Sequence, residues 1–294
     1  MENLHYLFVI NPNSGKKNAP EIMDKINKLL TGKMRFDIVK WTTLQEFEKI
    51  AATFITSGYT HVVAVGGDGS VNLTATHLLN KNIVLGIIPS GSGNGLARSL
   101  GISMNTDEAL LQLLKNRVDK IDVGCVNGKY FFCTSGTGFD AHIGKLFAGL
   151  KTRGLKMYIK LIVKEFFSYK PQQYKINIDG KEISRTAFFI TIGNAGQFGN
   201  DFYIAPKAIL NDGLLNVVIL KPFNLLNSVG ILIRVLMKQA DKSRFIESYT
   251  GKNIIITREK PDSVHFDGEP GMETEILQYS VFPNKIAVVT GKML

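Results

Sequence analysis

Short apolar runs alternate with segments of helical periodicity over about the first 120 residues. The runs span Leu4–Ile10, Phe36–Trp41, Val62–Val65 and Ile83–Ile88. Between them, apolar residues recur at helical spacing, at Ile22, Ile26, Leu29 and Leu30, at Leu44, Phe47, Ile50 and Phe54, and across Val71–Leu79. Alternating strands and helices require parallel pairing, and uniformly apolar strands are typical of a sheet that is covered on both faces. We therefore predict an α/β domain, with Gly32 and Gly58 ending its first two helices.

The pattern changes near Ile121, where shorter strand-like runs begin to dominate. These runs are Tyr174–Ile178, Ala187–Ile192, Leu214–Leu220, Asn253–Thr257 and Ile286–Val289. Turn signals at Asp179-Gly180 and Asp212-Gly213 separate some of them, and helical insertions interrupt them at about 140–169 and 223–240. The sequence thus predicts a second, mostly antiparallel β-sandwich domain. We expect residues 1–122 to form the first domain and residues 123–294 the second.

The two cysteines, Cys125 and Cys133, flank a predicted hairpin. Asn127-Gly128 is a strong signal for a two-residue turn, which would place Cys125 opposite Tyr130 and turn Cys133 to the other face. A disulfide between them is therefore not expected, and two reduced thiols are typical of a cytoplasmic protein.

Neither a signal peptide nor a membrane span is expected from the hydrophobic runs. The chain enters strand-like Tyr6–Ile10 almost at once, and no run approaches the roughly 20 apolar residues that a spanning helix needs. The longest candidate, Val229–Met237, is short and contains Arg234.

The chain is basic, with a net charge of +10 and a pI of about 9.4. Such a charge favours an anionic partner, either nucleotide phosphates, nucleic acid or an acidic membrane surface, although a generally basic solvated surface has the same composition. No aromatic and basic recognition motif accompanies the charge, so we expect no nucleic-acid partner.

A glycine-rich loop, Gly66-Gly67-Asp68-Gly69, follows the buried run Val62–Val65 and precedes a predicted helix from Ser70 onward. Its glycines allow a sharp turn and let phosphate oxygens approach main-chain amides, and the helix N-terminus adds a positive dipole end. The loop lacks the Lys-Ser/Thr ending of a Walker A motif. It is either an anion site or simply a tight turn from strand to helix.

Three further loops share this character: Asn11-Pro12-Asn13-Ser14-Gly15, Pro89-Ser90-Gly91-Ser92-Gly93-Asn94 and Asp267-Gly268-Glu269. The first two end predicted parallel strands, at the sheet edge where ligands bind in open α/β folds. In this order and spacing, the four loops resemble the diacylglycerol-kinase catalytic family, which includes sphingosine and ceramide kinases. The resemblance covers the whole chain. It implies a three-layer nucleotide domain like those of NAD kinase and 6-phosphofructokinase, followed by a β-rich domain.

The resemblance also implies an ATP site. Its residues would be Asn11, Pro12, Asn13, Ser14, Gly15, Thr42, Gly66, Gly67, Asp68, Gly69, Ser70, Val71, Asn72 and Ser92. Thr43 is an alternative to Thr42, one position away. Where family members usually have Gly-Thr, this chain has Gly91-Ser92, which keeps the hydroxyl. The following Asn94-Gly95-Leu96-Ala97 is closer to sphingosine and ceramide kinases than to bacterial diacylglycerol kinases, so the lipid stays open.

A magnesium site and a catalytic base are implied in the second domain. By resemblance, Asp212 and the main-chain carbonyls of Ile209 and Leu214 would bind magnesium, although Asn-Asp-Gly is also an ordinary turn.

Asp267 and Glu269 would point the same way if the preceding strand-like run continues through them. The resemblance makes Glu269 the proton acceptor and Asp267 its partner near the metal, with Asp68 as a rival base. An acidic hairpin turn at the surface is the alternative. His61, His77 and His265 show no metal-ligand spacing and are interpreted as structural or surface residues.

Residues 144–164 combine basic and apolar positions. The basic ones are Lys145, Lys151, Arg153, Lys156, Lys160 and Lys164, and they interleave with Leu146, Phe147, Leu150, Leu155, Ile159, Ile162 and Val163. This stretch either lies on an anionic membrane or packs its apolar face on the β domain.

Together these features predict an ATP- and Mg²⁺-dependent lipid kinase, which phosphorylates a hydroxyl of a diacylglycerol or sphingoid-type lipid. We expect it to be cytoplasmic and peripherally bound to the membrane, with a homodimer possible. One alternative is an NAD-kinase-like enzyme, but no Thr-Gly-Ser-Thr-Ala-Tyr-like segment is present. The other is a non-catalytic regulator that binds lipid or nucleotide, against which the loops and both carboxylates are intact.

Overall fold

The computed structural model describes residues 4–13, 18–149 and 155–292, and these form two units. Unit 1 contains residues 1–122 and 283–294, and unit 2 contains residues 123–282. The division after Asp122 lies where the hydrophobic pattern changes. Residues 283–294, which the sequence analysis placed in the second domain, belong instead to unit 1.

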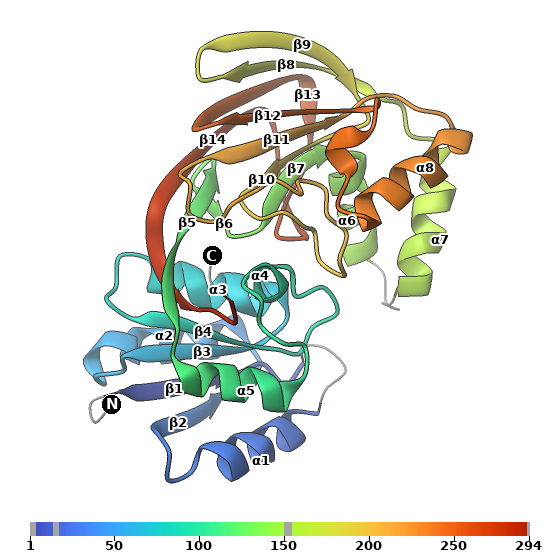
Figure 1. Cartoon of the computed structure of the whole chain (residues 1–294). Coiled ribbons are helices and arrows are strands. Elements are labelled where there is room, and N and C mark those ends of the chain that lie inside the picture. The colour runs from blue at the N-terminus through green and yellow to red at the C-terminus, as the bar shows by residue number, and fades with distance from the viewer. Residues whose placement is uncertain (1–3, 14–17, 150–154, 293–294) are drawn as a thin grey trace. The chain divides into compact units, whose positions relative to one another are not determined.

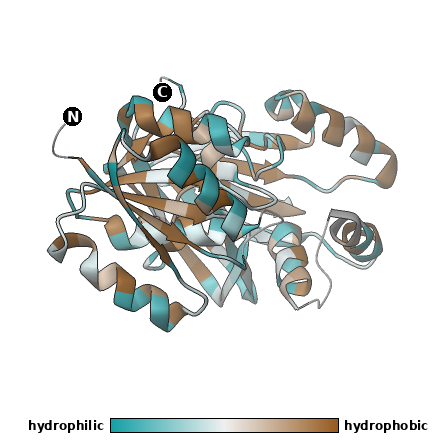
Figure 2. Cartoon of the chain, turned by 90° about the horizontal axis from the view of Figure 1, so that it is seen from below, coloured by the Kyte–Doolittle hydropathy of each residue, from teal (hydrophilic) through white to brown (hydrophobic). Residues whose placement is uncertain are grey.

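Unit 1 alternates strands and helices (Figure 1). Its elements are β1 (His5–Ile10), α1 (Ala19–Leu30), β2 (Arg35–Lys40), α2 (Leu44–Thr56), β3 (His61–Gly66), α3 (Asp68–Leu78), β4 (Val84–Pro89), α4 (Gly95–Ser99) and α5 (Thr106–Lys115). The strands pair in the order β4-β3-β1-β2, and all these pairs are parallel. Every residue of β1 and β3 is buried, as their uniformly apolar sequences predict. Figure 2 shows hydrophobic residues, in brown, along central strands and on parts of the helices.

Local signals set the ends of the helices. Gly32 and Gly58 have φ of 75° and 71°, a conformation that favours glycine, and they follow α1 and α2 as predicted. Thr43 and Glu46 form a capping box at the start of α2. The helix after the glycine loop begins at Asp68 rather than Ser70, with Gly67 as its N-cap. The loop therefore contains the first turn of α3.

The C-terminal end of β14 (Glu269–Val289) corrects one prediction. Ile286–Val289 was expected to pair within the antiparallel domain, but Val288 pairs in parallel with Leu85 of β4. The strand is 21 residues long, so it leaves unit 2 and its end adds an edge to the sheet of unit 1.

Unit 2 is a β-sandwich with helices. Its elements are β5 (Val118–Val126, which starts in unit 1), β6 (Lys129–Phe131), β7 (Thr134–Gly138), α6 (Phe139–Ala148), α7 (Leu155–Phe166), β8 (Gln172–Ile178), β9 (Lys181–Ala187), β10 (Phe189–Gly193), β11 (Leu215–Leu220), α8 (Leu225–Leu236), a 3₁₀ turn (Ala240–Lys242), β12 (Ile246–Gly251), β13 (Asn253–Phe266) and most of β14. The pairs β12-β11-β10-β7-β13-β14 are antiparallel, and the β8–β9 hairpin joins β13.

Strand β11 shows how the core of unit 2 is divided. Val217 and Ile219 lie in one apolar cluster with residues of β8, β10, β13 and β14, whereas Val218 and Leu220 lie in a second cluster with residues of α6 and α8. Because successive side chains of a strand point to opposite faces, the sheet buries both faces, one against strands and one against helices.

The predicted hairpin at Asn127-Gly128 is confirmed. Both turn residues have positive φ, 46° and 82°, and Cys125 pairs with Tyr130 across β5 and β6. Cys125 and Cys133 are both buried, and neither forms a disulfide. Burial raises the pKa of the Cys125 thiol.

His61 gives the stability of unit 1 a predicted pH dependence. Its ring stacks on Tyr6 with 4.2 Å between centroids, and Nε2 lies 3.0 Å from Asn116 Oδ1. Burial lowers the pKa of His61, so below about pH 6.5 the unfolded chain takes up a proton that the folded chain does not. We expect urea unfolding to show stability falling as the pH drops from 7 to 5. His61→Gln should flatten that dependence, and equal slopes in the two proteins would contradict the assignment.

Candidate active site

Asp68 joins two glycine-rich loops of unit 1. It is the first residue of α3, and its carboxylate accepts the main-chain N–H of Asn94 on Oδ2 at 2.8 Å and that of Gly95 on Oδ1 at 2.7 Å. The Asn94 side chain closes its own loop, because Oδ1 accepts Gly91 N at 3.0 Å and Nδ2 donates to Gly91 O at 2.8 Å. The loops after β3 and β4 therefore form one hydrogen-bonded unit.

The glycines of these loops are required by their mutual contact. A Cβ at Gly91 would lie 2.5 Å from Gly67 Cα, and a Cβ at Gly93 would lie 2.6 Å from Asp68 Oδ2. Such distances are too short for any side chain, so the two loops can approach only as glycine. The close approach follows the pairing of Gly66 with Pro89 at the ends of β3 and β4.

The loop at Asn11 is hydrogen-bonded to the first turn of α3. Asn11 Nδ2 donates to Ser70 Oγ at 3.0 Å, and Asn11 Oδ1 accepts Asn13 N at 3.0 Å. The amides in the first turn of α3 have no partners within the helix, which makes such a terminus suitable for phosphate oxygens. The structure thus brings together the strand ends at Asn11, Asp68 and Asn94.

Other predicted nucleotide contacts have different surroundings. Val71 is buried and its N–H donates to Gly67 O, so its contacts are those of a core residue. Thr42 Oγ1 donates to Glu46 Oε2 at 2.9 Å, and Thr43 is the N-cap of α2, so both threonines serve the start of that helix. Ser92 is exposed. Ser14 and Gly15 lie outside the described residues.

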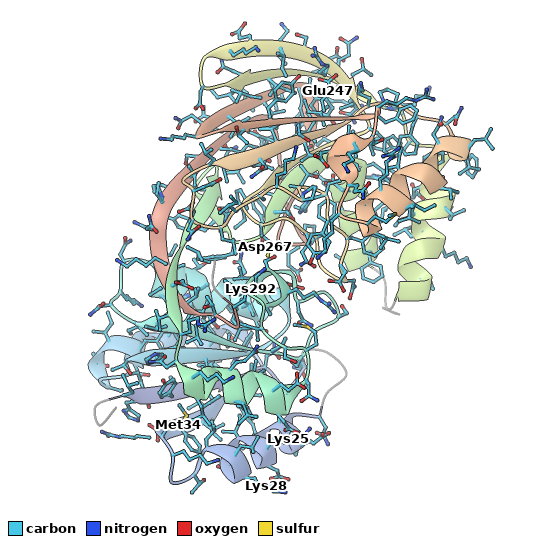
Figure 3. All side chains as sticks on the ribbon, in the orientation of Figure 1. Lys25, Lys28, Met34, Glu247, Asp267 and Lys292 are labelled. Carbon is cyan, nitrogen blue, oxygen red and sulfur yellow. The ribbon has the colours of Figure 1, made fainter. Side chains whose placement is uncertain are left out.

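Asp267 lies in a hairpin turn, not in a strand. Asp267 and Gly268 have φ of 48° and 87°, and they connect Phe266 of β13 to Glu269 of β14. The expected continuation of the strand through Asp267 is therefore wrong, because a two-residue turn with positive φ at both positions reverses the chain there. Figure 3 labels Asp267 in this turn.

The Asp267 carboxylate is occupied by main-chain donors. Oδ1 accepts Cys133 N at 2.7 Å and Thr134 N at 3.0 Å, and Oδ2 accepts Phe132 N at 2.9 Å. Glu269 is exposed, and no contact of its carboxylate is found among the described residues. The two carboxylates therefore differ: Asp267 holds the start of β7 to the hairpin, whereas Glu269 is open to a ligand.

A buried polar group next to this hairpin was not identified from the sequence. His265 is 4% exposed, and its Nε2 lies 3.1 Å from Asp140 Oδ2, which also accepts Thr191 Oγ1 at 3.0 Å. His265 Nδ1 is buried without a partner among the described residues. Nothing in the spacing of Asp140, Thr191 and His265 signals this contact, because it joins α6, β10 and β13 only in the folded chain.

The proposed magnesium ligands lie on the loop before β11. Asp212 is exposed, and its Oδ1 accepts Leu214 N at 3.0 Å, which closes a local turn. One carboxylate and two main-chain carbonyls supply the hard oxygen donors that Mg²⁺ accepts, so the donor chemistry fits the ion. In the described part of the chain, no group of three or more His, Cys, Asp or Glu residues is suited to a metal.

Residues 144–164 are only partly described. Residues 150–154, which include Lys151 and Arg153, lie outside the described ranges, as does the side chain of Lys156. On α7, Leu161, Ile162 and Phe166 pack against a core cluster of unit 2, and Lys160 and Lys164 are exposed. In the described part of α7 the apolar face thus packs on the β domain.

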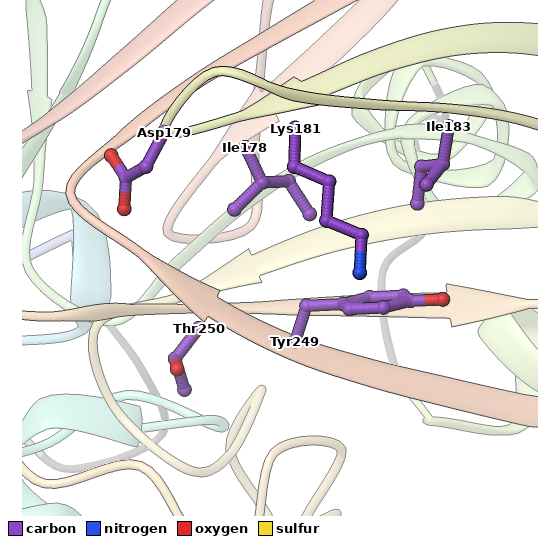
Figure 4. A pocket seen from close by; sticks show the side chains of 6 residues that line it. All are labelled: Ile178, Asp179, Lys181, Ile183, Tyr249 and Thr250. Atoms are coloured by element: carbon purple, nitrogen blue, oxygen red, sulfur yellow. The ribbon is translucent and has the colours of Figure 1, made fainter.

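One surface pocket of unit 2 contains none of the predicted site residues. It has a volume of about 360 Å³ and lies between the β8–β9 hairpin and β12, lined by Ile178, Asp179, Lys181, Ile183, Tyr249 and Thr250. Figure 4 shows Lys181 pointing toward the ring of Tyr249. The Asp179 carboxylate is already bound to the main-chain N–H groups of Lys252 and Asn253, which lower its pKa.

The chain resembles two groups of known sequences along its length. Residues 5–126 match the diacylglycerol kinase catalytic domain, and residues 134–290 match the YegS C-terminal NAD kinase beta sandwich-like domain. A protein of Chromohalobacter salexigens named "Probable lipid kinase YegS-like" is 30% identical over 220 residues, which cover 73% of this chain and 71% of that protein. The chain belongs to this lipid kinase family. A protein of the same name from Yersinia pestis is 29% identical over 280 residues, 90% of each chain.

Solved structures support the fold of this family member. A diacylglycerol kinase from Bacillus anthracis is similar with a TM-score of 0.75 at 22% identity, over 98% of this chain and 97% of that one. Another structure from that organism gives a TM-score of 0.80 at 23% identity. The predicted family and fold class are confirmed. No helix among the described residues is long and apolar enough to cross a membrane.

The Asp267 contacts predict a loss of stability in Asp267→Asn. Asparagine tolerates positive φ, and its side chain keeps one acceptor oxygen. Its NH₂ group, however, must face a main-chain N–H whose hydrogen bond the carboxylate accepted. We expect the free energy of unfolding to fall by about 1–3 kcal/mol, as for a hydrogen-bonded charge that is removed. Urea denaturation measures this loss. Glu275→Ala, an exposed change on β14, should stay within experimental error, and equal losses in both variants would contradict the anchoring role.

Proposed function

We propose that this lipid kinase transfers the γ-phosphoryl group of ATP to a lipid hydroxyl with Mg²⁺, and that Glu269 accepts the hydroxyl proton. The observation that carries the assignment of the base is the contrast among three carboxylates. Asp68 and Asp267 accept two and three main-chain N–H groups, respectively, whereas Glu269 is exposed and uncommitted among the described contacts. A base must reach the proton that it removes, which favours Glu269.

The nucleotide side of the proposal depends on the loops of unit 1. The first turn of α3, the Asn11 loop and the loop at Gly91 are held together by hydrogen bonds before any ligand binds. Fixed amides and a helix N-terminus are suited to phosphate, because little ordering remains to be done on binding. Bound Mg²⁺ would neutralise phosphate charge, and Asp212 with the Ile209 and Leu214 carbonyls is the proposed ligand set.

The chemistry requires alignment more than a strong base. A lipid alcohol is a poor nucleophile, but phosphoryl transfer passes through a loose transition state in which the proton leaves late. In this reading Glu269 takes that proton, and Asp267 positions the hairpin from which Glu269 projects. Asp68 maintains the nucleotide loops and has no role in proton transfer.

The lipid and the membrane contact are also proposals. The Asn94-Gly95-Leu96-Ala97 segment leaves diacylglycerol and sphingoid-type acceptors open. Purified protein incubated with labelled ATP, Mg²⁺ and a panel of diacylglycerol, sphingoid base, ceramide and phosphatidylglycerol tests the activity. Phosphorylation of one lipid supports the proposal, and none with any lipid in detergent micelles would refute it.

The contact between glycine loops predicts that Gly91→Ala loses nucleotide affinity. Its Cβ would lie 2.5 Å from Gly67 Cα, so the loops must separate. We expect ATP binding by calorimetry to weaken by roughly tenfold or more, because the amides lose their fixed geometry. Gly144→Ala in α6, where a Cβ meets only Gly268 O at 4.0 Å, is the control. Unchanged ATP affinity in folded Gly91→Ala would exclude a nucleotide site at this contact.

The candidate bases should fail in different ways. Glu269→Gln keeps the size of the side chain but cannot take a proton, so we expect ATP affinity to survive while kcat falls by roughly 10²–10⁴-fold. Asp68→Asn replaces one of the two oxygens that accept the main-chain N–H groups of Asn94 and Gly95, so ATP affinity should fall. The assignment is wrong if Glu269→Gln keeps full kcat while Asp68→Asn loses turnover at unchanged ATP and Mg²⁺ affinity.

A further inference from the structure

Helix α8 has two apolar faces, and within the described part of the chain only one of them is buried. Ile231 and Val235 are buried in the second core cluster of unit 2. Seven other apolar side chains of the helix and its C-cap are exposed: Leu225, Leu226, Val229, Leu232, Ile233, Leu236 and Met237. Leu226 is 88% exposed, Val229 61% and Met237 60%. The helix lies at the margin of unit 2 in Figure 1.

The exposed side chains form one continuous surface. At 100° per residue, the seven positions fall within an arc of about 140° of the helix circumference. Ile231 and Val235 lie outside this arc, beside the half-buried Asn227 and Ser228. The two apolar faces are therefore separate. We call the seven exposed side chains the outer face of α8.

Helix α1 shows the contrast, because it exposes no such face. In α1, Ile22, Ile26 and Leu30 are buried, and the exposed positions after Pro20 carry polar or charged side chains. That arrangement is the ordinary one for a helix that packs on a sheet. Large contiguous apolar surfaces on a folded protein mark contacts with a membrane or another protein.

The charge around α8 is one-sided. Residues 221–244 contain five cationic side chains, Lys221, Arg234, Lys238, Lys242 and Arg244, and a single carboxylate, Asp241. Asp241 is paired with Lys207 at 2.8 Å. Arg234, Lys238, Lys242 and Arg244 are exposed, so this segment carries an excess of positive charge.

We propose that the outer face of α8 inserts into the surface of an anionic lipid bilayer. The helix has 12 residues, which is about 18 Å, so it can lie in the interface but cannot span it. Its apolar side chains would enter the acyl region, and Arg234 and Lys238 would meet the phosphates of the lipid headgroups. This inference rests on the proposed function, because a kinase for a membrane lipid must reach its acceptor at a bilayer.

A second copy of the chain fits the same surface less well. A two-fold contact between outer faces would place one set of cations close to an identical set, with Asp241 already paired. The net charge of +10 also opposes self-association. Anionic headgroups supply the charge that a second copy lacks.

Double substitution of exposed residues tests the insertion. Leu226→Gln with Ile233→Gln replaces two exposed side chains of the outer face, so folding should persist. We expect partition onto vesicles of phosphatidylcholine and phosphatidylglycerol to fall by roughly tenfold to a hundredfold in sedimentation. The matched control, Leu44→Gln with Ile55→Gln on α2, replaces residues that are 57% and 60% exposed and should bind as the original chain does.

Two further readouts identify the contact. Arg234→Gln should weaken binding to vesicles that contain phosphatidylglycerol and leave binding to pure phosphatidylcholine unchanged. In Leu226→Trp, the fluorescence of the new indole ring should be quenched by lipids brominated on their acyl chains. The fluorescence of Trp41, which is 8% exposed and is the only natural tryptophan, should not be quenched. The insertion is excluded if the original chain does not bind the vesicles, or if the Leu226/Ile233 variant binds as well as the control.

The test also separates this proposal from its rivals. A dimer in lipid-free solution that the Leu226/Ile233 variant converts to monomers, with vesicle binding unchanged, would assign the surface to a second copy. Phosphorylation of lipid in detergent micelles reports the proposed function without a bilayer. If that activity is absent while vesicle binding depends on α8, the proposed function fails and the insertion stands. If the activity is present while vesicle binding does not depend on α8, only the insertion is refuted.

Discussion

The arrangement of the nucleotide loops depends on the pair of hydrogen bonds that the Asp68 carboxylate accepts from Asn94 and Gly95. Without this acceptor, the two amides would face the start of α3 unpaired. The loops also meet where Gly66 pairs with Pro89, and a Cβ on Gly91 would lie only 2.5 Å from Gly67 Cα. The Gly-Gly-Asp-Gly and Gly-Ser-Gly-Asn segments are therefore two halves of one structure. Each segment therefore has its structural meaning only in the presence of the other, and neither sequence identifies a nucleotide site alone.

Unit 2 uses the same chemistry at its turns. Asn127, Asp179 and Asp267 each precede a glycine, adopt positive φ and bind main-chain groups of a neighbouring segment through their side chains. A short acceptor at a turn costs little entropy and fixes the neighbouring strand. Asp68 and Asp267 thus serve as anchors in their own units. Glu269, one residue beyond such a turn, gains a fixed position from its neighbour while its own carboxylate stays available.

Features that depend on neighbouring residues were predictable from the sequence. The Asn127-Gly128 hairpin, the glycines after α1 and α2, and the buried strands β1 and β3 follow from turn chemistry and hydrophobic pattern. The role of a carboxylate was not predictable in this way. Asp267 was expected beside a metal, yet its oxygens bind amides more than 130 positions away in the sequence. Likewise, β14 runs from unit 2 into unit 1, where its end pairs with β4. A local sequence pattern cannot show this distant pairing.

A local sequence pattern also could not show which helical insertion of unit 2 exposes an apolar face. From the sequence, the amphipathic stretch 144–164 was equally consistent with a membrane contact and with packing on the β domain. On α7, however, Leu161, Ile162 and Phe166 are used by the core, so amphipathicity there records packing. Helix α8 has two separate apolar faces, and the sequence analysis considered its apolar run only as a candidate membrane span that is too short. The described part of the chain supplies an apolar environment for one of these faces, at Ile231 and Val235. The other face is exposed among the described residues, and the cations around it favour the proposed lipid surface.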